Sequence, residues 1–203
     1  MSQPLVTHYL EDALATFRAY KKLAEKALDQ ITEEEFFTTL DGESNSIAVV
    51  MKHLAGNMLS RWTNFLTTDG EKPDRNRDLE FVIEPQTTKD DVLAYWQKGW
   101  ACVFAAIEPL QPDDFERKVL IRGEEHTIVR AINRQMTHYA YHIGQIVFLA
   151  KHFRSHDWKS LSIPRNRSAE FNKYLEHRTT ESEKQHRFDA AKSFASNSRK
   201  DGA

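Results

Sequence analysis

Thr127-Ile-Val-Arg-Ala-Ile-Asn-Arg-Gln-Met-Thr-His-Tyr-Ala-Tyr-His-Ile-Gly-Gln-Ile-Val-Phe-Leu-Ala-Lys-His-Phe153 is the stretch that decides the fold. It contains no proline and a single glycine, so the sequence predicts one helix of about seven turns. Two largely apolar stripes run along roughly opposite sides of this helix, and a helix of that kind needs packing partners on both sides. One stripe holds Val129, Ile132, Met136, Ala140, Ile143 and Val147, and the other holds Ala131, Gln135, His138, His142, Ile146 and Leu149.

Two histidines on the second stripe stand four residues apart. His138 and His142 therefore project from the same helix face, one turn from each other, and two imidazoles so placed can bind one metal ion. His152 and His156 have the same spacing, but they stand among charged residues at the helix end and are interpreted as solvated. A histidine on an apolar stripe needs a partner, so the first pair is either a pair of metal ligands or a pair of hydrogen-bonded core histidines.

The composition narrows the class of protein. With 40% hydrophobic and 29% charged residues in 203 positions, the chain is typical of one soluble globular domain. The net charge of −2 argues against nucleic acid or an anionic membrane as the main partner. Neither a secretory signal nor a membrane span is recognisable, and the only cysteine excludes an internal disulfide. We expect a cytoplasmic protein.

Apolar periodicity and capping signals place the other elements. Thr32, Ser46 and Thr88 each precede a sequence typical of a helix start. A β-prone run and a turn glycine predict a short β-hairpin in residues 117–127. We therefore predict an all-α fold, a four-helix bundle with a hairpin excursion before the last long helix, spanning residues 1–175. A polar, partly mobile C-terminal extension is expected at 176–203. The predicted long helices cover residues 5–28, 47–66, 88–107 and 127–153.

A third histidine can complete a metal site. His53 lies on the edge of the predicted helix 47–66, from which it can face the bundle or bond to a neighbouring residue. Together with His138 and His142 it would provide three imidazoles and leave open metal positions, as in catalytic sites. Zinc or nickel suits such ligands best, with iron or copper possible. A di-iron site is excluded, because only one Glu-x-x-His element, Glu183 to His186, occurs.

Several stretches together resemble a known group of proteins. They are His53-Leu-Ala-Gly-Asn57, Ser60-Arg-Trp-Thr-Asn-Phe-Leu-Thr-Thr-Asp-Gly-Glu-Lys-Pro73, Arg75-Asn-Arg-Asp78, His138-Tyr-Ala-Tyr-His-Ile-Gly-Gln-Ile146 and Ser160-Leu-Ser-Ile-Pro-Arg165. Over about residues 5–174 the chain is similar to the DinB/YfiT-like superfamily of metalloproteins, and in particular to a domain-of-unknown-function branch of the 1572 type. The resemblance implies a four-helix bundle, commonly a homodimer, with a divalent metal on His53, His138 and His142.

The resemblance also implies an activity. Some superfamily members look like metal-dependent S-transferases that join a low-molecular-weight thiol to a small electrophile. A metal ion makes a bound thiol a thiolate near neutral pH, and water at the same position would become a hydrolytic nucleophile. Asn57 and Arg61 are the candidate substrate-binding residues, and the basic segment 72–77 is a candidate for anion recognition. The catalytic residues stay unknown, because no carboxylate has a spacing that places it near the histidines.

Two other classes of function fit the same sequence. The chain can be a non-catalytic, dimeric metal-binding or stress-related binding protein, in which the metal is a sensor or a structural element. It can also be a helical scaffold whose core histidines bind no metal. Metal content and the effect of chelation on stability separate these hypotheses.

Overall fold

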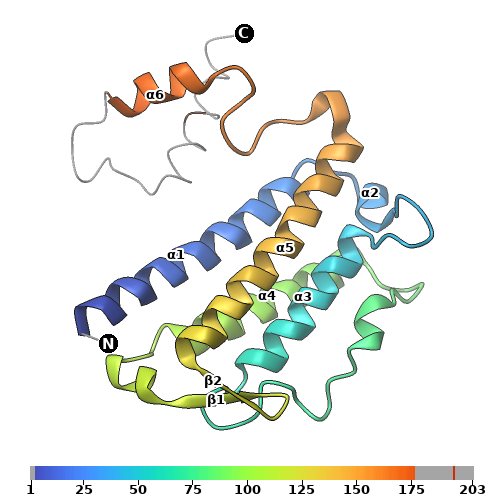
Figure 1. Cartoon of the computed structure of the whole chain (residues 1–203). Coiled ribbons are helices and arrows are strands. Elements are labelled where there is room, and N and C mark those ends of the chain that lie inside the picture. The colour runs from blue at the N-terminus through green and yellow to red at the C-terminus, as the bar shows by residue number, and fades with distance from the viewer. Residues whose placement is uncertain (1–2, 177–193, 195–203) are drawn as a thin grey trace. The chain divides into compact units, whose positions relative to one another are not determined.

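The computed structural model describes residues 3–176 and residue 194 (Figure 1). The chain forms two compact units, Met1–Phe153 and Arg154–Ala203. The first unit holds every predicted site residue, and in the described residues it is mostly helical with one two-stranded antiparallel sheet. Its elements are α1 (Gln3–Leu28), α2 (Glu33–Phe37), α3 (Ile47–Trp62), η1 (Asp78–Phe81), α4 (Lys89–Ile107), η2 (Pro112–Glu116), β1 (Lys118–Ile121), β2 (Glu124–Thr127) and α5 (Ile128–Arg154).

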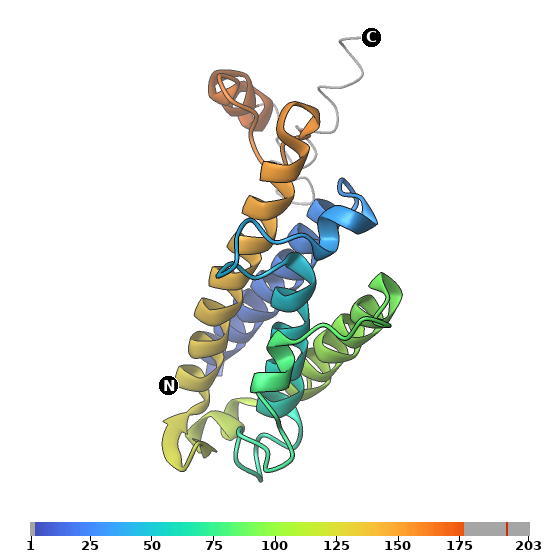
Figure 2. The ribbon, with the colours of Figure 1, turned by 90° about the vertical axis from the view of Figure 1, so that its right-hand side faces the viewer.

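The four long helices of the first unit lie side by side (Figures 1 and 2). Aromatic side chains fill the space between them, with Phe17 of α1 touching Trp62, Trp100 and Tyr139 from the other three helices. The Nε1 of Trp62 donates a hydrogen bond of 2.9 Å to the hydroxyl of Tyr139, so α3 and α5 are joined inside the core. Gly99 allows α4 to approach α3 closely, since a Cβ there would lie 3.0 Å from the Cα of Ala55.

The predicted helix starts are confirmed. The side chains of Thr32, Ser46 and Thr88 accept hydrogen bonds from backbone N–H groups in the first turns of α2, α3 and α4. The predicted end of the second long helix was wrong. We expected it to continue to residue 66, but α3 ends at Trp62, because Thr63 is extended and Asn64 has a positive φ of 49°.

The β-hairpin before α5 is confirmed. Lys118 pairs with Thr127 and Ile121 with Glu124, and the turn residues Arg122 and Gly123 have positive φ angles of 56° and 75°. That backbone is the type of turn that suits a two-residue hairpin loop. Asp69 accepts hydrogen bonds from the N–H groups of both turn residues, at 2.8 and 2.7 Å. The loop after α3 is thereby attached to the hairpin.

The second unit contains η3 (Ser155–Asp157) and α6 (Ser168–Glu176). Its apolar contacts centre on Phe171, whose ring lies 5.4 Å from that of Phe194, with Ile163 and Tyr174 packed against both. Apart from residues 176 and 194, the predicted extension 176–203 lies outside the described residues, and so does the Glu183–His186 element. Within the described chain, no helix has both the length and the apolar character needed to cross a bilayer.

Candidate metal centre

The three predicted histidines come together between α3 and α5. His53 stands in the second turn of α3, a helix whose start is determined by the Ser46 cap, and His138 and His142 stand one turn apart on α5. The ring centroids of His53 lie 5.4 Å from His138 and 5.0 Å from His142, and those of the α5 pair are 4.7 Å apart. One nitrogen from each ring lies within 4.8 Å of the other two. Within the described part of the chain, this is the only such group of possible ligands.

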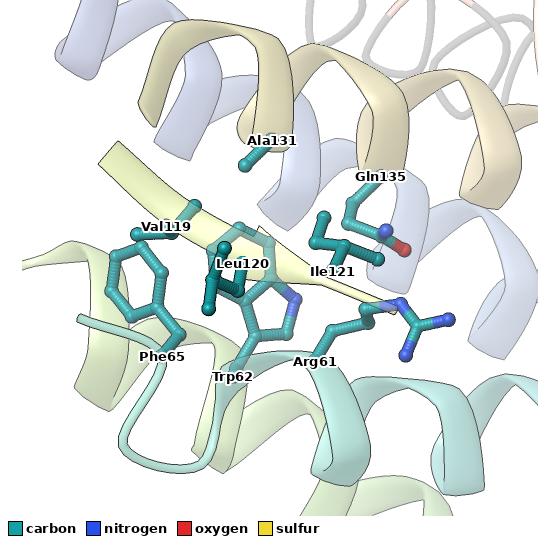
Figure 3. Close-up of a pocket in the computed structure, with 8 residues that line it drawn as sticks. All are labelled: Arg61, Trp62, Phe65, Val119, Leu120, Ile121, Ala131 and Gln135. Atoms are coloured by element: carbon teal, nitrogen blue, oxygen red, sulfur yellow. The ribbon is translucent and has the colours of Figure 1, made fainter. Parts of the chain in front are cut away.

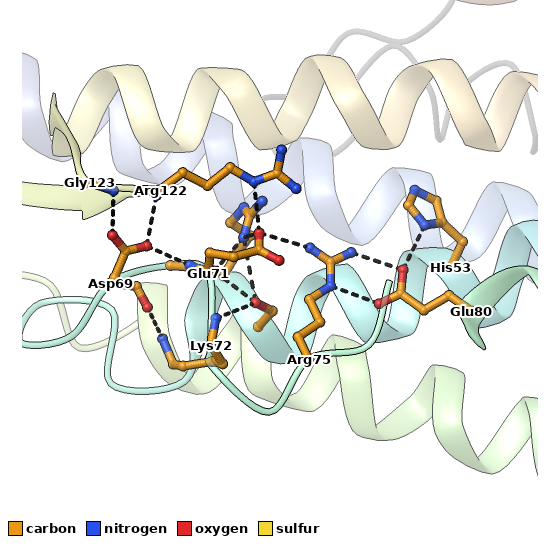
Figure 4. Close-up of polar contacts among 11 residues, drawn as sticks. His53, Asp69, Glu71, Lys72, Arg75, Glu80, Arg122 and Gly123 are labelled. Atoms are coloured by element: carbon orange, nitrogen blue, oxygen red, sulfur yellow. Dashed lines mark hydrogen bonds and ion pairs between the residues drawn. The ribbon is translucent and has the colours of Figure 1, made fainter. Parts of the chain in front are cut away.

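A carboxylate orients the ring of His53. The Nδ1 of His53 lies 2.8 Å from Oε2 of Glu80, a buried residue of η1 (Figure 4). Two hydrogen bonds from Arg75, of 2.8 and 2.9 Å, reach the two oxygens of the same carboxylate. Burial alone would raise the pKa of Glu80, but the hydrogen bonds from His53 and Arg75 outweigh it and lower the pKa. An ionised Glu80 accepts a hydrogen bond from the Nδ1–H group of His53, so Nε2 is the available ligand atom.

The space for Glu80 depends on a glycine of α3. A Cβ at Gly56 would lie 2.3 Å from Oε1 of Glu80, which is far inside contact distance. Gly56 stands three residues after His53, so the helix face that carries the histidine also makes room for its partner.

The α5 histidines are held in the neutral form. Burial, followed by the charges of His142 and His53, lowers the pKa of His138 to about 3. The pKa of His142 is also lowered, mainly by burial. The Nδ1 of His142 lies 2.7 Å from Oε1 of Gln145, and the buried Nδ1 of His138 has no hydrogen-bond partner among the described residues. Neutral imidazoles are the form that binds metals.

One carboxylate oxygen joins three arginines beside the histidines. Oε2 of Glu71 lies 2.8 Å from Nη1 of Arg61, 3.1 Å from Nε of Arg122 and 3.4 Å from Nη1 of Arg75 (Figure 4). Arg61 also donates to the carbonyl of Gly70. These contacts tie the segment 69–80 to α3 and to the hairpin turn, so the loop is an ordered wall of the site.

An open cavity of about 830 Å³ lies in front of the three histidines. Both predicted substrate-binding residues, Asn57 and Arg61, are in its wall, together with Arg75 and Arg77 of the predicted basic segment. Lys72 of that segment bonds instead to the carbonyl of Asp69. The residues that line the cavity are Asn45, His53, Asn57, Arg61, Arg75, Arg77, Phe81, Arg122, Arg134, Thr137, His138, Tyr141, His142 and Gln145.

Sequence reasoning missed four contributors to the site. Gln145 follows His142 by three residues on the same helix, so its spacing could have revealed it. Arg134 precedes His138 by four residues on α5 and carries the same kind of signal. Glu80 and Arg122 carry no such signal, because their positions depend on how a loop and a hairpin turn pack against the helices.

The second histidine pair is not part of the site. His152 and His156 are exposed, and the ring of His152 stacks on Phe148 at 6.4 Å. Neither residue belongs to the cavity wall.

The fold and the site together define a mostly helical protein with a candidate three-histidine metal centre in the wall of an arginine-lined cavity. The DUF1572 family, described as proteins of unknown function, matches residues 5–167. The chain belongs to this family. No curated protein and no solved structure matches the chain.

Proposed function

We propose that the chain is a DinB-like four-helix bundle and a divalent-metal-dependent enzyme that acts on a small molecule. The observation that carries the proposal is the convergence of one nitrogen each from His53, His138 and His142 to within 4.8 Å. Two nitrogens bound to one zinc ion stand at most about 4.2 Å apart, since each bond measures about 2.1 Å. The donor set therefore fits a metal ion after small ring movements.

The chemistry of the three histidine nitrogens also supports the binding of a divalent metal ion. Three neutral nitrogens suit zinc or nickel best, with iron or copper as further candidates. A bound metal of this kind would supply Lewis acidity, lowering the pKa of a thiol or a water molecule. Glu80 and Gln145 would hold the rings of His53 and His142 in the orientation and tautomer needed for binding.

The reaction class we propose is S-transfer from a low-molecular-weight thiol, or hydrolysis. A cavity of about 830 Å³ is within the range of small-molecule sites, which supports a small substrate with room for a second reactant. Glu80 is the carboxylate closest to this chemistry, but it is paired with Arg75 and His53. We therefore assign Glu80 a positioning role and assign no general base.

A homodimer in the cytoplasm is part of the proposal. The outer face of α5 exposes two large side chains, Tyr141 at 64% and Phe148 at 61%. Gly144 lies between them, and a second copy of the chain would bury this face. The single cysteine, Cys102, is free, as is usual where thiols stay reduced.

Elemental analysis of protein purified without an affinity tag tests the metal centre. We expect about one divalent ion per chain in the wild type, none in His142→Ala, and full occupancy in the matched control His152→Ala. Activity is then measured as S-transfer from glutathione, bacillithiol or mycothiol to monochlorobimane, and as hydrolysis of nitrophenyl esters. A wild-type chain that binds none of zinc, nickel, iron and copper overturns the proposal. Bound metal that is needed only for stability would instead assign a binding protein.

A further inference from the structure

We propose that the substrate carries a carboxylate or phosphate group, and that Arg122 of the hairpin turn and Arg134 of α5 bind this oxyanion inside the large cavity. The inference rests on the proposed function, because it assigns the substrate class of the same cavity. Neither arginine belongs to the group of possible metal ligands. Oxyanion binding can therefore be measured on metal-free protein, separately from metal content.

Two rows of side chains on α3 and α5 each have an arginine near the hairpin. Each row repeats every four residues, so its members share a helix face. All six members line the cavity: His53, Asn57 and Arg61 on α3, and Arg134, His138 and His142 on α5. Because α3 ends and α5 begins beside the hairpin (Figure 1), Arg61 and Arg134 lie nearer to it than the histidines do. An oxyanion at this end would lie one to two helical turns, about 6 to 12 Å, from the candidate metal centre.

Arg122 lies at the same end of the cavity. Asp69 fixes the hairpin turn by accepting a hydrogen bond of 2.8 Å from the backbone N–H of Arg122. Oε2 of Glu71 accepts from Nε of Arg122 at 3.1 Å and from Nη1 of Arg61 at 2.8 Å (Figure 4). Burial is the main cause of the lowered pKa of Arg61, and the positive charge of Arg134 lowers it further, so Arg134 is close as well. Three arginines from three elements therefore gather at this end of the cavity.

Arg122 and Arg134 keep donors for a ligand. Within the described residues, the only side-chain contact of Arg122 is the Nε bond to Glu71, and the side chain of Arg134 has neither a hydrogen bond nor an ion pair. Both side chains are exposed, so they can turn towards a bound molecule. A guanidinium pairs two of its nitrogens with two oxygens of a carboxylate or phosphate, and this geometry makes arginine well suited to oxyanions.

Arg61 supplies charge rather than a second binding position. Its Nη1 already donates to Glu71 and to the carbonyl of Gly70. In Figure 3 its guanidinium points away from Val119 and Phe65, which line a small pocket beside the hairpin. That pocket measures about 10 Å³, enough for one water molecule and for no larger group. A substrate oxyanion therefore has room in the large cavity, which Arg61 also lines, and not in this pocket.

The charge of the cavity wall favours an anion. Five arginines line the cavity, and no aspartate or glutamate of the described chain does. The carboxylates that pair with these arginines are Glu71 and Glu80, so three positive charges are in excess before any metal ion is counted. Asp69 and Lys72, which do not line the cavity, carry opposite charges and offset each other. A positive excess of this kind attracts anions and repels cations.

Isothermal titration of the full chain with succinate and, separately, with inorganic phosphate tests the inference. Metal and chelator are both removed beforehand, and about 0.15 M sodium chloride screens charges more than about 8 Å away. We expect at least one of the two oxyanions to bind, with the stronger binder identifying the group, and the diamine putrescine not to bind. Metal-free protein that binds neither oxyanion, or that binds putrescine as strongly, overturns the inference.

Three substitutions locate the binding. Arg134→Gln changes an exposed side chain without partners in the described chain, so thermal stability should stay equal while oxyanion affinity falls about tenfold, and Arg122→Gln should weaken binding likewise. Arg130→Gln is the matched control, because it removes an exposed charge one turn earlier on α5, outside the cavity wall, and should keep wild-type affinity. Wild-type affinity in either Arg134→Gln or Arg122→Gln, or an equal loss in Arg130→Gln, contradicts the assignment. Zinc uptake measured on the same proteins reports on the proposed function independently.

Discussion

A histidine that binds a metal needs a definite tautomer, and at His53 a single carboxylate provides it. Glu80 accepts from Nδ1, and the two bonds from Arg75 keep the carboxylate ionised and fixed. The three side chains form a line that begins in the loop after α3 and ends at the candidate metal centre. The metal affinity of the site therefore depends on residues that would not touch the metal.

Changing Glu80 to glutamine tests this dependence. The Glu80→Gln side chain can still accept a hydrogen bond from His53, but it no longer neutralises Arg75. We expect zinc affinity to fall about 10- to 100-fold, measured by competition with a chromogenic chelator. Glu84→Gln, at an exposed position of the same loop, is the matched control and should bind zinc like the wild type. Equal affinities in all three proteins would show that Glu80 has no positioning role.

The buried α5 histidines also predict how stability depends on pH. His138 has an ordinary pKa of 6.5 when unfolded and a pKa of about 3 in the fold, mainly because of burial. Above 6.5 both states are neutral. As the pH falls from 6.5 towards 3, the unfolded state takes up a proton that the folded state does not, so stability falls with the pH.

We expect the chelator-treated protein to lose stability between about pH 7 and about pH 5, measured as the urea midpoint. His138→Gln removes the contribution of His138 and should make the dependence weaker, with His142 still contributing, whereas His8→Gln, at an exposed position of α1, should keep the wild-type slope. A His138→Gln protein that loses as much stability on acidification as the wild type contradicts the assignment.

At the scale of elements, local signals in the sequence were sufficient for the helix starts and the hairpin. Capping side chains such as Ser46 and Thr88 act within one turn, so they are readable from neighbouring residues. The early end of α3 was not readable, because it depends on the left-handed Asn64 and on bonds from Thr67 and Thr68 to its carbonyl.

The histidine triad was predicted from spacing and resemblance, and the structure brings its members together. Its supporting residues were not predicted. Glu80 lies 27 positions from His53, in a loop whose course is set by contacts with α3 and the hairpin turn. Long-range contacts of this type have no periodic signature.

Alanine substitutions at two helix glycines distinguish an effect on the Glu80 contact from an effect on helix stability. Gly56→Ala places a methyl group 2.3 Å from Oε1 of Glu80, so the Glu80 carboxylate must shift from its position beside His53. We expect weaker zinc binding in the same chelator competition. Gly144→Ala meets nothing within 4 Å and should stabilise the chain by roughly 0.5–1 kcal/mol with zinc affinity unchanged. Wild-type zinc affinity in Gly56→Ala would mean that the Glu80 contact is dispensable.

At the scale of the whole molecule, one face of α5 carries large apolar side chains that do not pack in the core of the first unit. Tyr141 and Phe148 stand on the outer side of α5, two turns apart, and Tyr141 is also part of the cavity wall. A second copy of the chain seated on this face would therefore lie beside the mouth of the cavity. Tyr141 therefore links the proposed dimer to the proposed activity, because it belongs to both the α5 face and the cavity wall.

Replacing Phe148 with glutamate tests the proposed dimer. A carboxylate in the middle of an apolar interface would be buried without a partner, so the Phe148→Glu protein should sediment as a monomer where the wild type sediments as a dimer. Leu79→Glu alters a side chain that is 55% exposed on η1 and not on α5, and should remain dimeric. Sedimentation velocity at several protein concentrations distinguishes the two states. A monomeric wild type, or a dimer that persists in Phe148→Glu, would mean that this face of α5 has another role. The metal content of Phe148→Glu should equal that of the wild type, because within the described residues the ring of Phe148 packs on His152 and on none of the three site histidines.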